Sequence, residues 1–351
     1  MKLYFQLLSL TANGRLFVSG MIVVLLLSAI IQPLMASDNL LFVEAQMVGG
    51  YSSSIDEVIL YSHHFHEAMQ KPSVGFDFVK RFGNESRDWG LLAIQYRVAY
   101  QQDSKPRYAS QLYNAYYKQK LPGLDVWIGS NKPAVGLTSN LDNHAVLLSD
   151  MSMKVFTFDR DWGVGAEKDM DWLKLSGSAT NGSGMQIYNK HGNYLLAGRM
   201  GLGNLNKSNY NLGFSAAHGK VLEAMGYTLG HPDAQSGEYI LHGMDYVGMD
   251  GSLRYLNIDL KFDSLLGEFY NKPAKAIMLR TGIHLLEEER LTLEAQVIYS
   301  KYVVFENFNG ELAAAYKLNS DFTLRAMGDY DTRQETYKII GQLYYYKPLG
   351  L

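Results

Sequence analysis

Strict alternation of apolar and polar residues in the C-terminal quarter constrains the fold of this chain more than any other feature. In residues 276–286 one set of alternate positions is apolar, whereas the other carries Arg280 and His284. Four later segments repeat the pattern: 291–299, 308–318, 322–330 and 337–345. Because successive side chains of a strand point to opposite faces, each segment makes one apolar and one polar surface. Their length of about nine to eleven residues is what a tilted strand needs to cross a hydrocarbon layer. The pattern therefore predicts a transmembrane β-barrel.

The rest of the chain carries further strand signals at short spacing. Eleven segments qualify: 41–48, 74–82, 89–100, 111–121, 126–132, 162–168, 173–180, 194–202, 211–218, 239–247 and 253–262. With the C-terminal segments they give about sixteen strands (roughly fourteen to eighteen), an even number as bacterial single-chain barrels require. We therefore predict an all-β fold, an antiparallel transmembrane β-barrel that occupies residues 37–351 as one domain.

The connections between these segments are of two kinds. Residues 121–124, 168–171 and 318–321 are tight turns, whereas residues 219–238 form a long connection. Short turns on one side and long loops on the other are the arrangement of outer-membrane barrels, with the short turns on the periplasmic side.

Composition agrees with this fold. A mean hydropathy of −0.13 fits a barrel, because half of each spanning strand faces water. The absence of cysteine excludes disulfides and thiol chemistry and is compatible with an oxidising periplasm. The 25 tyrosines suit aromatic girdles at the two membrane interfaces.

The N-terminus is typical of a secretory signal peptide. Lys2 and Arg15 precede an apolar run at residues 16–31, which ends at Pro33. Residues 34–36 (Leu-Met-Ala) resemble a cleavage site, so we expect residues 1–36 to be removed, with an uncleaved anchor as the alternative. Loss of those two cations, and of no acidic residue, leaves 30 basic against 35 acidic side chains, a net charge of −5. This mild acidity argues against nucleic acid as a partner.

One connection, residues 132–160 (loop 132–160), is unusually long and apolar. Loops of this length in compact domains are usually functional or disordered. Val135, Leu137, Leu141, Leu147 and Leu148 make it too apolar for an external loop. We predict that it is the third external loop, that it folds inward against the barrel wall, and that it narrows the lumen.

Short motifs around this loop resemble those of the phosphate-selective porins and their porin-like relatives. The resemblance lies in the segments 127–136 (Trp-Ile-Gly-Ser-Asn-Lys-Pro-Ala-Val-Gly), 138–140 (Thr-Ser-Asn) and 158–164 (Phe-Asp-Arg-Asp-Trp-Gly-Val), and it continues to about residue 200. It implies a Gram-negative outer-membrane porin in which the strand end, here Gly-Ser-Asn-Lys-Pro at residues 129–133, leads into the constriction loop. It also implies a homotrimer.

Polar positions of the alternating segments supply candidate channel residues. The predicted pore-lining residues are Arg97, Lys118, Arg199, Arg280, Glu294, Lys317, Arg325, Asp329 and Lys338. The predicted constriction residues of loop 132–160 are Lys132, Asp142, His144, Asp150, Lys154 and Arg160. Phosphate selection, which the resemblance implies, needs a ladder of arginine and lysine. The mixed wall found here does not provide one, and the arginines have the alternative role of neutralising lumen acids such as Glu294 and Asp329.

Metal binding and catalysis have weak sequence support. His63, His64, His66 and Glu67 form the only metal-like cluster, but adjacent strand histidines face opposite ways and no second cluster completes a site. His144, near Asp142 and Ser149, is the nearest approach to a catalytic constellation, with no nucleophile elbow in the chain. We expect no enzyme activity and no cofactor.

The sequence favours a diffusion porin for small polar or anionic solutes, embedded in outer-membrane lipid. The main alternative is a barrel sheath that houses a partner protein, such as a periplasmic cytochrome. Since the chain has no Cys-x-x-Cys-His haem site, the electron carrier would be a separate protein. A third hypothesis, an adhesin or purely structural barrel, calls for long polar external loops, whereas the loops here are moderate.

Overall fold

The computed structural model describes residues 39–350 apart from short gaps at 61–70, 85–86, 101–107, 142–145, 156–157, 190–191, 205–207, 223, 226–227, 230–238 and 303–304. Sixteen long strands dominate it: β1 (Asn39–Ser52), β3 (Ser73–Asn84), β4 (Arg87–Tyr100), β5 (Tyr108–Leu121), β6 (Leu124–Asn131), β7 (Asp161–Asp169), β8 (Leu173–Thr180), β9 (Tyr194–Leu202), β10 (Tyr210–Leu222), β13 (Leu241–Tyr255), β14 (Ile258–Phe269), β15 (Lys272–Leu285), β16 (Leu291–Tyr302), β17 (Phe305–Lys317), β18 (Phe322–Asp331) and β19 (Thr336–Gly350). The short elements are β2 (Glu57–Ile59), η2 (Leu137–Ser139), α3 (Met151–Lys154), β11 (Ala224–Met225), β12 (Thr228–Leu229) and η3 (Glu287–Glu289).

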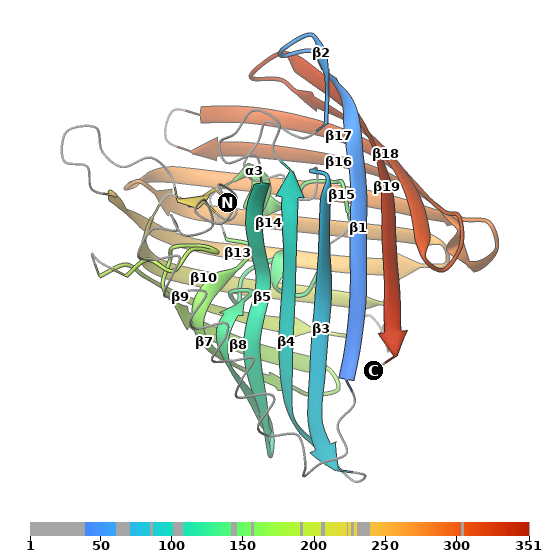
Figure 1. The fold of residues 1–351 in the computed structure, drawn as a ribbon. Coiled ribbons are helices and arrows are strands. Elements are labelled where there is room, and N and C mark those ends of the chain that lie inside the picture. The colour runs from blue at the N-terminus through green and yellow to red at the C-terminus, as the bar shows by residue number, and fades with distance from the viewer. Residues whose placement is uncertain are drawn as a thin grey trace, which may run out of the picture.

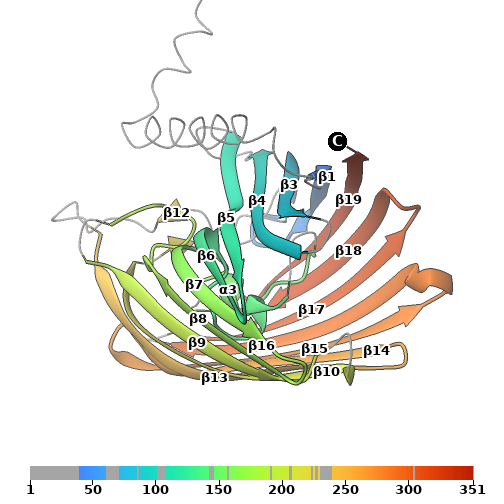
Figure 2. The same cartoon turned by 90° about the horizontal axis from the view of Figure 1, so that it is seen from below.

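Each long strand pairs antiparallel with the next, and the first pairs with the last. The closing ladder between β1 and β19 runs from Leu40 opposite Gly350 to Ser52 opposite Lys338. β2 adds three residues to one end of β1. The sixteen long strands thus form a closed barrel, as Figures 1 and 2 show. The predicted all-β fold and the count of sixteen strands are confirmed.

The barrel turns its apolar residues outward. Along β15 the even-numbered residues from 274 to 282 are buried, whereas Ile277, Leu279 and Ile283 are 46%, 54% and 40% exposed. The same alternation leaves Leu312, Leu324 and Ile339 exposed on β17, β18 and β19. An outer surface built from leucine and isoleucine is the reverse of a water-soluble protein, and it fits a barrel wall that faces hydrocarbon.

The two ends of the barrel differ in their connections. At one end, here called the turn end, adjacent strands are joined by short links such as 122–123, 170–172 and 318–321. At the opposite end, the loop end, the links include 132–160, 181–193 and 223–240. The tight turns and the long connection predicted from the sequence fall at these two ends as expected. No helix among the described residues is long and apolar enough to cross a membrane.

One predicted strand was wrong. Residues 253–262 do not form a single strand, because β13 continues to Tyr255 and β14 begins at Ile258. The reversal occurs at Leu256, which has a left-handed φ of 53° and is 79% exposed. The two-residue turn is Leu256-Asn257, and leucine at its first position, flanked by Tyr255 and Ile258, makes the segment look like a continuous strand although Asn257 is a typical turn residue.

Loop 132–160 contributes to two apolar clusters inside the barrel. Val135, Leu137, Met151 and Phe158 pack against inward-facing residues of β9, β10 and β13–β16. Leu147 and Leu148 pack against inward-facing residues of β1, β18 and β19. The inward fold predicted for this loop is what the structure shows (Figure 2), and by strand order it follows the fifth barrel strand.

Candidate functional site

The first part of loop 132–160 runs along the inner wall and is bound to it by backbone N–H groups. Ala134 N–H donates to Ser178 Oγ at 3.1 Å on β8, and Gly136 N–H donates to Ser215 Oγ at 3.3 Å on β10. Leu137 N–H then donates to Asp263 Oδ2 at 2.9 Å on β14. Gly136 has a φ of 55°, and a Cβ there would lie 2.8 Å from the Asp263 carboxylate. The glycine therefore allows both the turn and the close approach to the wall.

The middle of the loop is held at Ser149. Its backbone N–H donates to Glu311 Oε2 at 2.9 Å on β17. Its carbonyl accepts from Arg280 at 2.7 Å on β15 and from Gln296 at 2.8 Å on β16. The three wall side chains are themselves linked, since Arg280 Nε donates to Gln296 Oε1 at 2.5 Å and Gln296 Nε2 donates to Glu311 Oε2 at 2.9 Å. All three are buried, so this network is shielded from solvent.

Lys154, at the end of α3, joins the loop to the next two inward carboxylates. Its ammonium lies 3.3 Å from Asp329 Oδ2 and 3.9 Å from Glu311 Oε1. Lys338 on β19 lies 3.3 Å from the same Asp329 oxygen. One carboxylate on β18 therefore binds two lysines, one from the loop and one from the wall.

The returning chain is fixed near β5 and β7. Arg160 Nε donates to Asn114 Oδ1 at 3.0 Å, pairs with Asp159, and lies 5.4 Å from the centre of the Tyr113 ring. Asp161 accepts from the backbone N–H groups of Gly182 and Ser183 at 2.6 and 3.3 Å. These bonds join the end of loop 132–160 to residues 181–193, the next connection at the loop end.

All nine predicted pore-lining residues lie on the inward-facing positions of their strands, and most of their charges are paired. Arg97 is fully buried, 2.7 Å from Glu44 Oε1 and 4.7 Å from the Tyr113 ring. Arg199 binds Asp250 through two bonds of 2.6 and 2.9 Å and Asn211 at 2.7 Å. When its amide oxygen is turned toward Arg199, Asn140 of the loop accepts from it at 2.6 and 3.2 Å.

The remaining predicted pore-lining residues lie nearer the turn end, and some are more exposed to solvent. Lys118 pairs with Glu167 across β5 and β7. Arg325 donates to Gln342 Oε1 at 2.9 Å and lies 4.8 Å from the Tyr344 ring. Glu294 is partly exposed near the turn end of β16, and Lys317 is exposed at the turn end of β17.

The predicted loop residues are placed in three ways. Lys132 donates to the carbonyl of Leu141, within the loop itself. Asp150 is buried and accepts from Ser152 Oγ at 2.5 Å, whereas Lys154 and Arg160 contact the wall as above. Asp142 and His144 lie outside the described residues, as do His63, His64, His66 and Glu67. Among the residues that the structure describes, no group of three or more histidines and carboxylates could hold a metal ion.

Sequence reasoning missed several inward acids, among them Glu44, Asp250, Asp263 and Glu311. Glu311 shares its strand parity with Lys317, so the alternation could have found it. Asp250 fell between two predicted strands and Asp263 just beyond one, because the turn at residues 256–257 was not recognised.

Comparisons with known proteins agree with the fold. No protein-family model and no curated protein matches the sequence. Among solved structures, the chain is similar to a loop L8 deletion mutant of OmpT, an outer membrane protein of Vibrio cholerae, with a TM-score of 0.62, 11% identity, and coverage of 89% of this chain and 100% of that one. An anion-selective porin from Comamonas acidovorans gives a TM-score of 0.61 at 8% identity, with the same coverage. Salmonella typhi OmpF in complex with daunomycin gives 0.66 at 9% identity, covering 88% of this chain and 97% of that one. At such low identity the likeness shows a shared barrel fold.

Proposed function

We propose that this protein is an outer-membrane porin, a water-filled channel through which small polar or ionic solutes diffuse passively. The observation that carries the proposal is the seating of loop 132–160 inside a closed barrel, with the Ser149 peptide bound to Arg280, Gln296 and Glu311. A loop held across the lumen by buried polar bonds limits the size of what can pass. Selection then comes from pore width and local charge, without covalent chemistry.

The paired charges of the wall support weak selectivity. Arg97, Arg199 and Lys338 each have a carboxylate within 3.3 Å. A phosphate-selective channel needs basic groups that can replace the hydration of the anion. Cations already neutralised by Glu44, Asp250 and Asp329 serve this purpose poorly. We infer a general or weakly selective pore.

The finer assignments rest on sequence features. The relationship to the phosphate-selective porins is supported by the motifs at residues 127–136 and 158–164, and the trimer follows from that relationship. Export to the outer membrane through a cleavable signal peptide at residues 1–36 is supported by its apolar run and the small residue at Ala36. The apolar outer surface of the barrel supports a location in a membrane.

Conductance of the purified protein in a planar lipid bilayer under a salt gradient tests the proposal. Steady open steps are expected, and the sign of the reversal potential identifies the preferred ion. A folded barrel that inserts but stays silent would exclude the diffusion pore. Its lumen would then be examined for a partner protein, the sheath alternative, by co-purification from the outer membrane.

A further inference from the structure

A charged cluster lies on the outer face of the barrel at the loop end. Lys301 Nζ donates to Glu306 Oε2 at 2.6 Å, and Tyr299 OH donates to Glu306 Oε1 at 2.9 Å. The ammonium of Lys275, directly opposite Lys301 in the β15–β16 ladder, lies 5.5 Å from the centre of the Tyr299 ring. The side chains of Lys301 and Glu306 are 52% and 55% exposed. Two lysines with one carboxylate leave this cluster with a net charge of +1.

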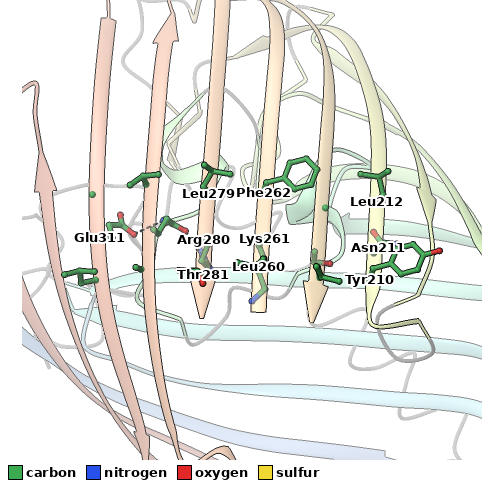
Figure 3. Close-up of a pocket in the computed structure, with 18 residues that line it drawn as sticks. Tyr210, Asn211, Leu212, Leu260, Lys261, Phe262, Leu279, Arg280, Thr281 and Glu311 are labelled. Atoms are coloured by element: carbon green, nitrogen blue, oxygen red, sulfur yellow. Dashed lines mark hydrogen bonds between the residues drawn. The ribbon is translucent and has the colours of Figure 1, made fainter. Parts of the chain in front are cut away.

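A hollow lies on the same outer face, further from the loop end. It has a volume of about 970 Å³ and spans β10 and β13–β17. Among its lining residues Leu260, Leu279 and Leu312 are 48%, 54% and 67% exposed, whereas Arg280 and Glu311 from the same strands are buried. The open space is therefore outside the barrel. Figure 3 shows the lining side chains following one another across the neighbouring strands.

Small residues make the hollow. Ala295 and Gly310 stand between larger neighbours on β16 and β17, and a Cβ added at Gly310 would meet no atom within 4 Å. The lining is almost entirely apolar, so water gains little by filling it. An apolar chain of irregular shape fits it better than a flat protein surface does.

The charged cluster and the hollow lie along the same two strands, β15 and β16. On β15 the outward residues run Lys275, Ile277, Leu279, and on β16 they run Lys301, Tyr299, Val297. At about 3.4 Å per residue, Lys275 lies roughly 14 Å from Leu279 along the strand. Lysine side chains at one end can bind an anionic headgroup, and the apolar hollow at the other end can bind an acyl chain.

We propose that this outer face binds an anionic phospholipid, with the phosphate beside Lys275 and an acyl chain in the hollow. Lysine binds phosphate as a point charge. Lys301 is already paired with Glu306, whereas the Lys275 ammonium lies over the Tyr299 ring, so Lys275 is the cation offered to the phosphate. The inference rests on the proposed location of the barrel in a membrane, and it is independent of conductance. A barrel that conducts but fails the lipid tests below would contradict the lipid proposal and leave the porin proposal standing.

Lipid binding can be measured by native mass spectrometry of the protein in detergent. The probes are dioleoylphosphatidylglycerol, dioleoylphosphatidylcholine and inorganic phosphate, each titrated alone. We expect one phosphatidylglycerol to be retained more tightly than phosphatidylcholine, and Lys275→Gln to weaken its binding about fivefold. Lys220→Gln is the matched control, because Lys220 is another exposed outward lysine, on β10 and outside the cluster. Equal losses in the two variants would overturn the proposed site, as would equal retention of inorganic phosphate.

A second pair of variants tests the hollow. Gly310→Leu should fill it and speed dissociation of the lipid, whereas Gly341→Leu should not, because Gly341 is outward-facing on β19 and outside the hollow. The nearest atom to a Cβ at Gly341 would be 3.8 Å away, so both substitutions fit the wall. A second copy of the chain is the rival occupant. If Gly310→Leu lowered the oligomeric mass and left lipid retention unchanged, the hollow would be a subunit contact and the lipid proposal would be wrong.

Discussion

Arg280 on β15 donates at 2.7 Å to the main-chain carbonyl of Ser149, a residue 131 positions earlier in the chain. The bond joins a wall side chain to the backbone of loop 132–160. Gln296 donates to the same carbonyl and Glu311 accepts from the N–H of the same residue, so both backbone polar groups of Ser149 are bound by the wall. Because backbone groups are bound, the position of the loop here depends on the wall residues more than on the side chain of Ser149.

Arg280→Ala should loosen the loop and raise conductance. Hydrogen bonds that involve a charged group contribute about 1.5–3 kcal/mol each, and this variant loses the bonds to Ser149 and Gln296. We expect larger and noisier single-channel currents than in the wild type. The measurement is single-channel recording in a planar bilayer at one fixed salt concentration.

Arg325→Ala is the control for that experiment. It removes the same positive charge from the inward face, but the contacts of Arg325 within the described part of the chain are with Gln342 and Tyr344 on β19. Its conductance noise should stay at the wild-type level. If both variants change the current to the same extent, charge and not anchoring explains the effect of Arg280.

Deletion of residues 135–150 should raise conductance. The loop lies over Asp263 and Glu311, whose carboxylates bind the backbone N–H groups of Leu137 and Ser149, and over Arg280, which binds the Ser149 carbonyl. Without the loop, these groups face a wider lumen, and size exclusion by the loop is lost. Single-channel conductance in a planar bilayer checks this effect. Unchanged conductance would remove the constriction role of the loop.

The sequence was sufficient for the barrel because its signal is periodic. Alternation along 276–286 or 337–345 identifies both the strand and its inward face, and that parity placed Arg280, Asp329 and Lys338 correctly on the inner side. Alternation alone does not reveal a reversal as short as Leu256-Asn257, in which only the second residue is a typical turn former. Leu256 reverses the chain between β13 and β14, and the inward acids on either side of it, Asp250 and Asp263, were missed for that reason.

The contacts of the loop lay beyond sequence reasoning for a different physical reason. Ser149 and Glu311 are 162 residues apart, and nothing local in either segment encodes their bond. Such a contact exists only after the barrel closes and brings β15–β17 opposite the loop. The apolar content of the loop predicted that it folds inward, but its partners had to be observed.

Removing one member of the buried pair Arg199–Asp250 should destabilise the fold more than replacing both members with apolar residues. Their side chains are 1% and 0% exposed. Asp250→Asn leaves a buried guanidinium without its counter-charge, which costs about 3–5 kcal/mol of the free energy of unfolding. The double variant Arg199→Met with Asp250→Leu should be closer to the wild type, since it removes both charges. Urea unfolding in lipid vesicles, followed by tryptophan fluorescence, of the wild type, Arg199→Met, Asp250→Leu and the double variant gives the four corners of the cycle. Additive losses would mean that the two charges do not stabilise each other.

Gly136→Ala should displace the start of the loop, beyond the strain that any left-handed alanine carries. Gly136 and Gly123 both have positive φ, of 55° and 81°. Alanine at either position costs about 1–2 kcal/mol of backbone strain. Only at Gly136 does the new Cβ meet another group, the Asp263 carboxylate at 2.8 Å, whereas at Gly123 there is nothing within 4 Å. Gly136→Ala should therefore lower the free energy of unfolding further than Gly123→Ala, and it should also raise conductance, because Leu137 loses its bond to Asp263. Equal losses of stability with unchanged conductance would show that the contact between Gly136 and Asp263 does not position the loop.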